Sequence, residues 1–364
     1  MTALRGLSAL GLLSLGAAAA HADAPPLSEV LASSGITATG YVAASYFHSS
    51  ATNTYHNYDV GHDTFQLDQA GLTVAYQPKE GFGAVVNLIA GEDARLQNSF
   101  EPPGNGSTNS AVEILQAYLQ YATGGLTVIA GKYTTLAGAE VIAPTGNTNF
   151  SRSLLFTYEP AVHTGIRATY AVNDMFGFTL GVNNGWNYDS TSYGSKTGEV
   201  GISFTPSKAF ILTAQAYIGK DPAFDASRKI IDLVATWNAT DALSIIVSYD
   251  WGRQEGASLF TATGADTAKW NGLAGYVNYK FSDQWRLSLR GEYFDDKEGL
   301  PTGPVQKLKE GTLTLGYAPT ANFELRFEGR YDKSDVSSFL KYPISSGLTA
   351  ENQTEFAVQG LFKF

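Results

Sequence analysis

Acidic and basic residues alternate with apolar ones along the segment NFELRFEGRY, in a spacing that suits the wall of a water-filled channel. Side chains alternate between the two faces of a β-strand, so one face of this segment carries its charges: Glu324, Arg326, Glu328 and Arg330. Fixed charges of both signs order water and set local fields, which favours small polar solutes and ions. The alternative is that the charges neutralise one another and only solvate the interior of the channel, without selecting solutes.

Other segments with the same alternation extend this polar face. If the apolar face of each strand meets lipid, the polar face lines the lumen. The further charged residues predicted to line the pore are Arg167, Asp232, Asp250, Arg286, Arg290 and Glu292. The same face carries Thr169, Thr213, Gln215, Ser248, Glu355 and Lys363.

Several histidines lie near carboxylates in the first long polar segment. The residues are His48, His56, His62, Asp59 and Asp63. Their spacing matches no compact metal motif, so we expect a solvated loop and no metal. His163 stands apart, and spacing provides no Ser or Asp partner for it. No Gly-rich phosphate loop leads from a strand into a helix. We therefore predict neither a cofactor nor an enzyme.

The composition excludes several classes of protein. The formal net charge of −10 argues against nucleic acid as a partner, because no basic stripe is present to meet phosphates. Cysteine is absent, which excludes thiolate catalysis and Cys-based metal sites and suits export through an oxidising periplasm. Charged residues make up 16% of the chain, while 38 glycines, 20 Tyr and 20 Phe indicate many strands and tight turns.

The first residues have the features of a secretory signal peptide. Arg5 precedes an apolar run that ends near AHA, a small-x-small cleavage site. The run is too short to span a membrane as a helix. We predict a signal peptide over 1–22, a short periplasmic segment over 23–36, and a mature chain that leaves the cytoplasm.

Alternation with period two continues almost to the end of the chain and predicts strands. Short turns lie at 77–81, 122–125, 172–174, 205–208, 238–241, 282–283 and 318–322. Long loops cover roughly 49–64, 92–111, 134–160, 187–196, 220–228, 253–267, 295–306 and 334–352. This sorting by length indicates an all-β fold over 37–364, a transmembrane antiparallel up-and-down β-barrel of about sixteen strands. The short turns would be periplasmic and the long loops extracellular.

Aromatic residues bracket most of the short turns at near-constant spacing. The pairs are Tyr76 and Phe82, Tyr170 and Phe176, Phe204 and Phe210, Phe281 and Trp285, and Tyr317 and Phe323. Aromatic residues favour strand ends in any β protein. Brackets this regular nevertheless favour a girdle of amphipathic rings at a lipid–water interface.

The chain ends on an alternating segment, TEFAVQGLFKF, whose last residue is aromatic. In lipid every backbone N–H and C=O must be paired, so the sheet must close and the final strand must pair with the first, near 37–48. Phe364 would then lie at the periplasmic girdle. A terminal aromatic on such a strand resembles the sorting signal that the barrel-assembly machinery recognises. We therefore expect that machinery and outer-membrane lipid as partners.

A resemblance to a known family is concentrated in residues 131–170. The stretch GKYTTLAGAEVIAPTGNTNFSRSLLF and the following HTGIRATY resemble the Putative beta-barrel porin-2 (OmpL-like) family of Gram-negative outer membranes. The resemblance extends, mainly as pattern, over nearly the whole mature chain. It implies a porin of about sixteen strands with a loop folded into the lumen. It brings no catalytic residues.

The long loop at about 134–160 is the predicted constriction. A barrel of this size is too wide for side chains to fill, so it leaves an aqueous channel unless something plugs it. The apolar run Leu154, Leu155 and Phe156 suits packing against the inner wall. The charged residues near the narrowest point would be Glu140, Arg152 and Glu159. The alternative is a loop that rests on the barrel rim.

The leading functional prediction is a porin for passive diffusion of small hydrophilic solutes and ions across the outer membrane. Two alternatives stay open. A barrel that imports an apolar ligand predicts an apolar lumen, which the arginine-rich faces oppose. A surface-exposed binding or adhesive barrel would use polar loops such as SSATNTYHNYD. The residues leave open the solute, the ion preference, and whether the protein is a monomer or a homotrimer.

Overall fold

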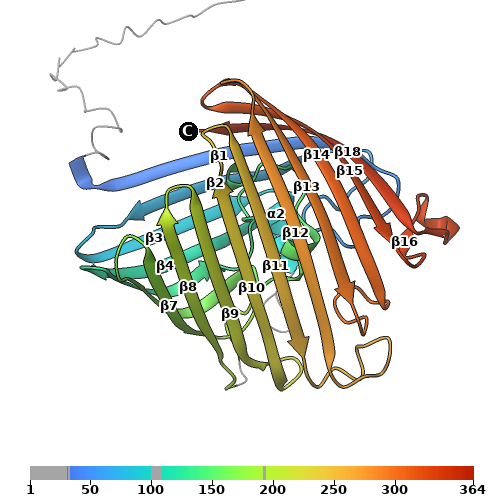
Figure 1. The fold of residues 1–364 in the computed structure, drawn as a ribbon, viewed down its shortest axis with the longest axis horizontal. Helices are drawn as coiled ribbons and strands as arrows, with labels where there is room; N and C mark the ends of the chain where they lie inside the picture. The colour runs from blue at the N-terminus through green and yellow to red at the C-terminus, as the bar shows by residue number, and fades with distance from the viewer. Residues whose placement is uncertain (1–30, 32, 100–108, 192–193) are drawn as a thin grey trace, which may run out of the picture.

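The chain forms a closed barrel of antiparallel strands, as Figure 1 shows. A computed structural model describes residues 31, 33–99, 109–191 and 194–364. In this part, sixteen strands form one closed sheet, which confirms the predicted fold. The predicted signal peptide and most of the segment that follows it lie outside the described residues. None of the helices in the described part has the length and apolar character needed to cross a lipid bilayer.

The barrel strands follow one another around the sheet in chain order. They are β1 (Ile36–Ser49), β2 (Thr64–Tyr76), β3 (Gly81–Ala90), β4 (Val112–Thr123), β5 (Leu126–Thr134), β6 (Val162–Ala171), β7 (Phe176–Asn183), β8 (Thr197–Ser207), β9 (Phe210–Asp221), β10 (Ala226–Asn238), β11 (Leu243–Gln254), β12 (Ala268–Lys280), β13 (Trp285–Asp296), β14 (Gln306–Thr320), β15 (Phe323–Ser334) and β18 (Asn352–Lys363). Each pairs with its neighbours along the chain, and β18 also pairs with β1.

The two faces of the barrel wall differ in chemistry. Along β13, Leu289 is 44% exposed while the adjacent Arg290 is 3% exposed. Other strands likewise turn large apolar side chains outward, among them Leu273, Val277, Leu313 and Phe327. Polar side chains on the alternate positions are buried inside. An apolar outer face is what lipid requires, so the alternation predicted from the sequence sets which face meets the membrane.

The last strand closes the barrel against the first, as predicted. Tyr41 of β1 lies opposite Lys363 of β18. Gly40 N donates to Phe364 O at 2.8 Å, and Phe364 N donates to Gly40 O at 2.9 Å, so the ladder continues to the final residue. A Cβ at position 40 would lie 2.4 Å from the Phe364 ring. Glycine at this position lets the terminal ring lie directly on the backbone of β1, and a larger residue would displace the ring.

Short connections gather at one end of the barrel and carry aromatic contacts. They cover 77–80, 124–125, 172–175, 208–209, 239–242, 281–284 and 321–322. The rings in contact near them are Phe82 and Tyr121 (4.9 Å between centroids), Phe176 and Phe204 (4.8 Å), and Trp285 and Tyr317 (4.4 Å). These contacts belong to the aromatic girdle expected at this end.

Long connections lie at the other end, with one exception. The sequence predicted a long loop over 220–228, but β9 and β10 are joined by residues 222–225 alone. The ladder continues as far as Asp221, which pairs with Ala226. The Asp221 carboxylate accepts a hydrogen bond from Ala223 N at 2.9 Å and forms an ion pair with Arg228 at 2.7 Å. These bonds stabilise a tight turn that polar composition alone does not reveal.

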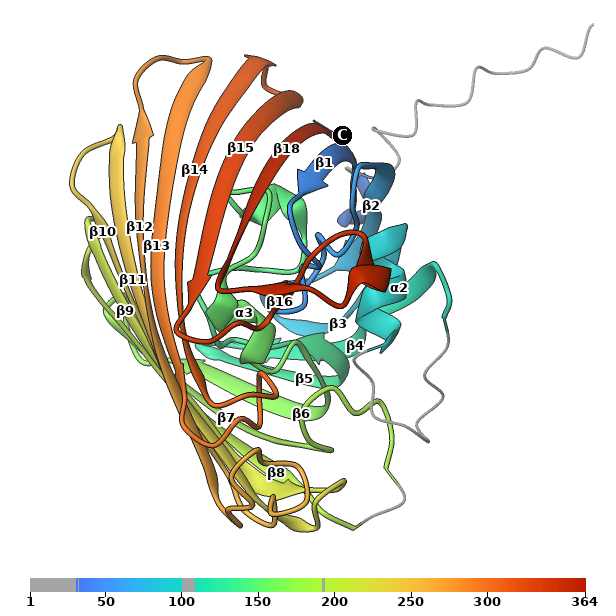
Figure 2. The same ribbon diagram turned by 90° about the vertical axis from the view of Figure 1, so that its right-hand side faces the viewer.

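Smaller elements lie within the long connections. They are α2 (Glu92–Ser99), η1 (Pro144–Gly146), α3 (Leu154–Tyr158), η2 (Ile344–Ser346), and the two-stranded pair β16 (Phe339–Leu340) and β17 (Thr349–Ala350). Figure 2 shows α3 inside the ring of strands. The apolar core of the protein therefore lies within the barrel, between the inner wall and the loops that enter it.

Candidate functional site: the loop inside the barrel

The connection between β5 and β6, residues 135–161, lies inside the barrel, and we call it the inner loop. Its Leu154 and Leu155 are each 1% exposed. They belong to one buried apolar cluster with Trp270, Ala274 and Phe294 of the wall. Burying a large aliphatic side chain stabilises a structure by about 1.5–3 kcal/mol. The apolar run therefore favours a loop docked on the wall over one extended into water.

The start of α3 is held by two oxygen acceptors. Ser153 is the N-cap residue, and its Oγ accepts a hydrogen bond from Phe156 N at 3.0 Å. The Glu292 carboxylate of β13 accepts from Leu154 N at 2.9 Å and from Leu155 N at 3.3 Å. A helix N-terminus presents unpaired N–H groups, which a carboxylate satisfies well. Glu292 therefore positions the helix.

A second wall carboxylate holds the backbone just before α3. Glu328 of β15 accepts hydrogen bonds from Phe150 N at 2.6 Å and from Ser151 N at 2.9 Å. Thr314 Oγ donates to the same carboxylate at 2.6 Å. Buried N–H groups without a partner cost free energy. Glu328 thus stabilises the inner loop by satisfying two donors that the lumen would otherwise leave unpaired.

Four wall arginines bind carbonyl oxygens of the inner loop. The bonds run from Arg286 to Thr148 O (2.6 Å), from Arg326 to Asn147 O (2.9 Å), from Arg290 to Ser151 O (2.8 Å) and from Arg330 to Arg152 O (2.6 Å). Each arginine also pairs with a wall carboxylate: Glu324, Glu310 or Asp332. A guanidinium has five N–H donors, so it can bridge the wall and the loop at once.

The charged residues predicted to line the pore on β13 to β15 point inward, but they face the inner loop. The exposed fractions of Arg290, Arg326 and Arg330 are 3%, 2% and 3%. The sequence analysis expected these residues to line the pore, and in the structure a segment remote in sequence covers their side chains. Their visible role is to bind that segment.

Two of the predicted constriction residues hold the shape of the inner loop. Glu140 accepts a hydrogen bond from Ser153 N at 2.6 Å and pairs with Arg290 at 2.9 Å. Arg152 donates to the carbonyl oxygens of Val141 (3.0 Å), Phe150 (2.8 Å) and Ile142 (2.8 Å). Both side chains are buried. Both side chains therefore bind groups of the inner loop and the wall, and they stabilise the conformation of the loop.

The third predicted constriction residue, Glu159, lies beside two wall carboxylates. Asp232 of β10 and Asp250 of β11 are cross-strand neighbours, and the three groups lie within 4.8 Å of one another. A Cβ at Gly138 would be 2.0 Å from Glu159 Oε2, so this glycine, with φ +88°, makes room for the carboxylate. Burial, together with the negative charge of Asp232, raises the pKa of Glu159 well above its usual value.

Arg167 forms a separate network at the start of the inner loop. It pairs with Glu199 at 2.8 Å and lies 4.2 Å from the centre of the Tyr133 ring. Glu199 also accepts a hydrogen bond from the Tyr217 hydroxyl at 3.0 Å. That hydroxyl accepts from Leu136 N at 3.0 Å. The network therefore fixes the backbone where the chain leaves β5.

The histidines do not form one group. His48 and His62 meet Asp63 at the surface, at 2.6 Å and 3.2 Å. His163 is buried, with its Nδ1 3.0 Å from Gly185 O and its ring stacked on Tyr217. No Ser, Asp or Glu accompanies His163 among the hydrogen bonds of the described residues, so a catalytic triad is not assembled there.

His56 is buried away from the other histidines. It contacts Asp59 at 2.6 Å and Asp332 of β15 at 3.0 Å. Burial and the charge of Arg330 disfavour its protonation, but the two aspartates outweigh them and raise the pKa of His56. The first long connection, residues 50–63, is thereby joined to the inner wall by an ion pair.

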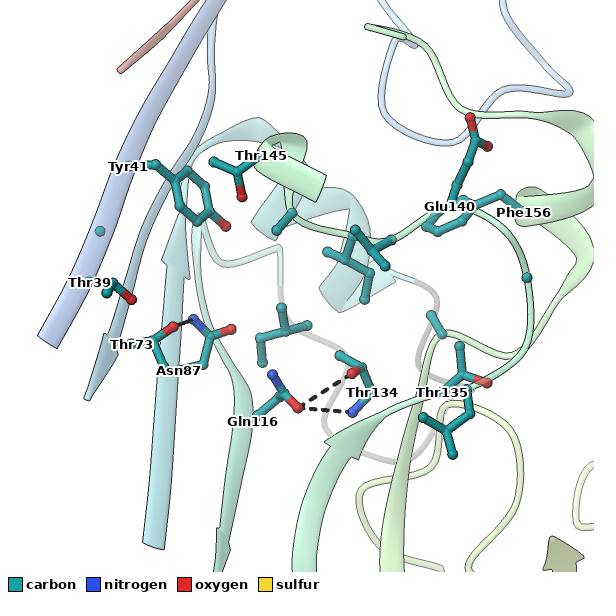
Figure 3. A pocket seen from close by; sticks show the side chains of 18 of the residues that line it. Thr39, Tyr41, Thr73, Asn87, Gln116, Thr134, Thr135, Glu140, Thr145 and Phe156 are labelled. Atoms are coloured by element: carbon teal, nitrogen blue, oxygen red, sulfur yellow. Dashed lines mark hydrogen bonds between the residues drawn. The ribbon is translucent and has the colours of Figure 1, made fainter. Parts of the chain in front are cut away.

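A cavity of about 650 Å³ lies between the inner loop and the wall formed by strands β1 to β5 and the end of β18. Figure 3 shows neutral hydrogen-bonding side chains around it, which include Thr39, Thr73, Asn87, Gln116, Thr134 and Thr135. The inner loop adds Val141, Ile142 and Phe156, and the charged residues at its edge are Glu140 and Lys363. This surface was not predicted from the sequence, because no charged residue or motif marks it there. The signal was Thr, Asn and Gln at inward positions of β1 to β4.

The comparisons with known proteins agree with this architecture. The family model described as "Putative beta-barrel porin-2, OmpL-like" matches residues 35–364. No curated protein matches the chain.

Solved structures share the fold at low sequence identity. The anion-selective porin from Comamonas acidovorans is similar with a TM-score of 0.63 and 12% identity, over 90% of this chain and 99% of that one. The outer membrane channel DcaP of Acinetobacter baumannii gives 0.60 and 13%, over 90% and 97%. A trimer form of OmpT, an outer membrane protein of Vibrio cholerae, gives 0.58 and 11%, over 90% and 99%. At such identities the similarity shows a common barrel fold.

Proposed function

Because the chain belongs to the Putative beta-barrel porin-2 (OmpL-like) family, we propose that it lets small hydrophilic solutes and ions diffuse passively across the outer membrane. The family match covers the whole barrel, residues 35–364. A closed barrel of sixteen strands is wide enough for an aqueous lumen. The inner loop narrows that lumen, so the space beside the loop sets which solutes pass.

The cavity beside the inner loop is the observation that carries the choice of solute. Its wall presents hydroxyl and amide groups beside Leu115 and Phe364, and its loop side presents mainly apolar groups. The arginines of β13 to β15 are bound to loop carbonyls and do not line this cavity, whose charged lining residues are Glu140 and Lys363. Neutral polyhydroxy or amide solutes display the same mixture of hydrogen-bonding and apolar surface. We therefore infer a preference for neutral polar solutes over strongly charged ones.

Swelling of proteoliposomes tests this preference. A neutral sugar and a sugar acid of nearly equal size are compared, and the neutral one should enter faster. Thr73→Val removes a hydroxyl from the cavity with little change of volume and should slow neutral entry. Thr263→Val, in the exposed connection after β11, serves as the control and should leave entry unchanged.

Two outcomes would overturn the proposal at different levels. Folded protein that neither conducts ions in planar bilayers nor permits swelling would exclude a channel. Equal entry of the neutral and anionic solutes would keep the channel and remove the neutral preference. The same recordings should show higher single-channel conductance when part of the segment 146–153 is deleted, because the barrel ladder does not depend on it.

We extend the proposal to the partners of the barrel. The exposed apolar outer face suits outer-membrane lipid, and the terminal Phe364, 64% exposed, suits recognition by the barrel-assembly machinery. The trimer form named for OmpT supports a homotrimer here as well. Native mass spectrometry of the detergent-extracted protein tests this, and a mass of one chain at all detergent concentrations would remove the trimer.

A further inference from the structure

Three groups of side chains in the described residues have potential metal ligands close together. They are His48 with His62 and Asp63, His56 with Asp59 and Glu355, and Glu159 with Asp232 and Asp250. The first two contain imidazoles that pair with their carboxylates. The third group consists of carboxylates alone. It has no imidazole to balance its negative charge, so that charge needs an explanation.

The third group joins the inner loop to the wall at β10 and β11. Asp232 and Asp250 are cross-strand neighbours that point inward, with exposed fractions of 0% and 2%. Glu159 comes from the end of the inner loop and is also buried, at 8%. One oxygen from each residue lies within 4.8 Å of the other two. Three acidic groups therefore lie close together in a buried part of the protein with little access to solvent.

No positive side chain offsets these groups in the described part of the chain, where none of the ion pairs includes Glu159, Asp232 or Asp250. Both carboxylate oxygens of Asp232 and Oδ1 of Asp250 are buried, and none of these atoms makes a hydrogen bond of standard geometry. A buried carboxylate without compensation is costly, so the groups must share protons or bind a cation.

A neutral oxygen beside the acids favours the cation. Ser248 lies one inward position from Asp250 on β11 and diagonally across from Asp232. It is 1% exposed, and its Oγ has no hydrogen-bond partner. This hydroxyl supplies a fourth oxygen beside the three carboxylates. A metal ion that gathers oxygens would use it.

We propose that Glu159, Asp232 and Asp250, together with Ser248, form a binding site for a divalent cation, with Ca²⁺ as the best fit. An all-oxygen set of carboxylates and a hydroxyl is the ligand type of hard cations, and zinc prefers nitrogen and sulfur. Ca²⁺ accepts irregular arrangements of six to eight oxygens. Mg²⁺ demands near-octahedral geometry and usually retains several waters, which so buried a place supplies poorly.

The position of this site gives the cation a structural task. Glu159 lies near the end of the inner loop and packs against Gly138 near its start. A cation held by Glu159 and the two aspartates would join both ends of the loop to β10 and β11. The carboxylates and arginines of β13 to β15 hold the middle of the loop. This inference concerns the docking of the loop and does not depend on which solute passes.

Calcium binding to the full-length folded protein in detergent tests the site. After treatment with EDTA and its removal, calorimetric titration with Ca²⁺ should show one site per chain. Tb³⁺ provides a second probe, since Trp186 and Trp270 line a pocket with Glu159 and should sensitise its luminescence. Asp232→Asn and Asp250→Asn should weaken binding at least tenfold. Asp241→Asn, in a short turn, should bind like the wild type.

Wild-type protein that binds neither Ca²⁺ nor Tb³⁺, or aspartate variants that bind as tightly as Asp241→Asn, would overturn the proposal. The unfolding temperature provides a second test, because the two explanations predict changes of opposite direction. This test does not depend on a calorimetric or luminescence signal. If the site binds a cation, adding Ca²⁺ should raise the unfolding temperature of the wild type. In Ca²⁺, Asp232→Asn should then unfold at a lower temperature than the wild type. If the acids only share protons, Asn relieves repulsion, and Asp232→Asn would unfold at an equal or higher temperature in Ca²⁺ and in EDTA alike. That result would also exclude the site.

Discussion

Replacing Glu328 by alanine should release the middle of the inner loop from the barrel wall. The carboxylate accepts hydrogen bonds from Phe150 N at 2.6 Å and Ser151 N at 2.9 Å, and both donors are buried. A hydrogen bond to a charged group contributes about 1.5–3 kcal/mol. Two such bonds contribute about 3–6 kcal/mol, which corresponds to about 10²-fold to 10⁴-fold in the docking equilibrium of the loop.

Amide hydrogen exchange measures this equilibrium residue by residue. Protection of the Phe150 and Ser151 amides should fall by about 10²-fold to 10⁴-fold in Glu328→Ala, since protection follows the free energy of local opening. The ladder amides of β14 and β15 should keep their protection. Glu328→Gln retains one acceptor oxygen and should lose less.

Lys333→Ala is the matched control because it changes an exposed residue on the outer face of the same strand. It should leave loop protection unchanged. If Glu328→Ala folds and keeps full protection at Phe150 and Ser151, the carboxylate is not what holds the loop. The apolar packing of α3 would then carry the docking.

Three further predictions concern the membrane face, assembly and pH. Leu289→Arg turns a charge toward lipid and should destabilise the barrel by about 2–4 kcal/mol if it lies near the midplane, measured by denaturant unfolding in lipid. Phe364→Asp should sharply reduce the heat-modifiable folded barrel in outer-membrane fractions, measured by gel shift, because the closing ladder then ends on a charge. The raised pKa of His56, caused by Asp59 and Asp332, means that its contribution to stability is full below the unfolded value of about 6.5 and is lost as pH rises through the folded value. Hydrogen exchange of residues 50–63 should therefore accelerate, beyond its intrinsic pH dependence, as pH rises above about 6.5.

Each of these predictions has a control. Leu289→Phe keeps an apolar group toward lipid and should unfold like the wild type, so equal stability of Leu289→Arg would contradict the facing of β13. Phe364→Tyr keeps an aromatic residue at the end of the chain and should assemble like the wild type. Normal assembly of Phe364→Asp would show that Phe364 is not an assembly signal. His56→Gln should abolish the extra pH dependence of residues 50–63. Its persistence in that variant would assign the effect to another group.

Much of the fold could be predicted from the sequence because lipid imposes strict conditions on it. Backbone groups in a membrane must all be paired, so an alternating chain with short and long connections has to close into a barrel. Alternation also places Leu289 outward and Arg290 inward without any knowledge of neighbours. The pairing of Phe364 with Gly40 follows from the same condition.

The partners of the inward charges could not be predicted in this way. Arg286 binds Thr148 O, although 138 positions separate the two residues. Alternation predicts whether a side chain points into the barrel or out of it. It does not predict which residue inside the barrel that side chain contacts. The tight turn at 222–225 likewise depends on the contacts of Asp221, which composition does not show.

The sequence by itself therefore determined the barrel, the facing of its residues and the aromatic end of its closing strand, because these follow from local periodicity and from the demands of lipid. The tertiary structure alone decided that the arginines of β13 to β15 bind loop carbonyls, that mostly neutral residues line the cavity beside the inner loop, and that Glu159, Asp232 and Asp250 meet without a positive partner among the described residues. These contacts join segments far apart in the chain. Their geometry is set by how the inner loop packs within the closed wall, which no local pattern encodes.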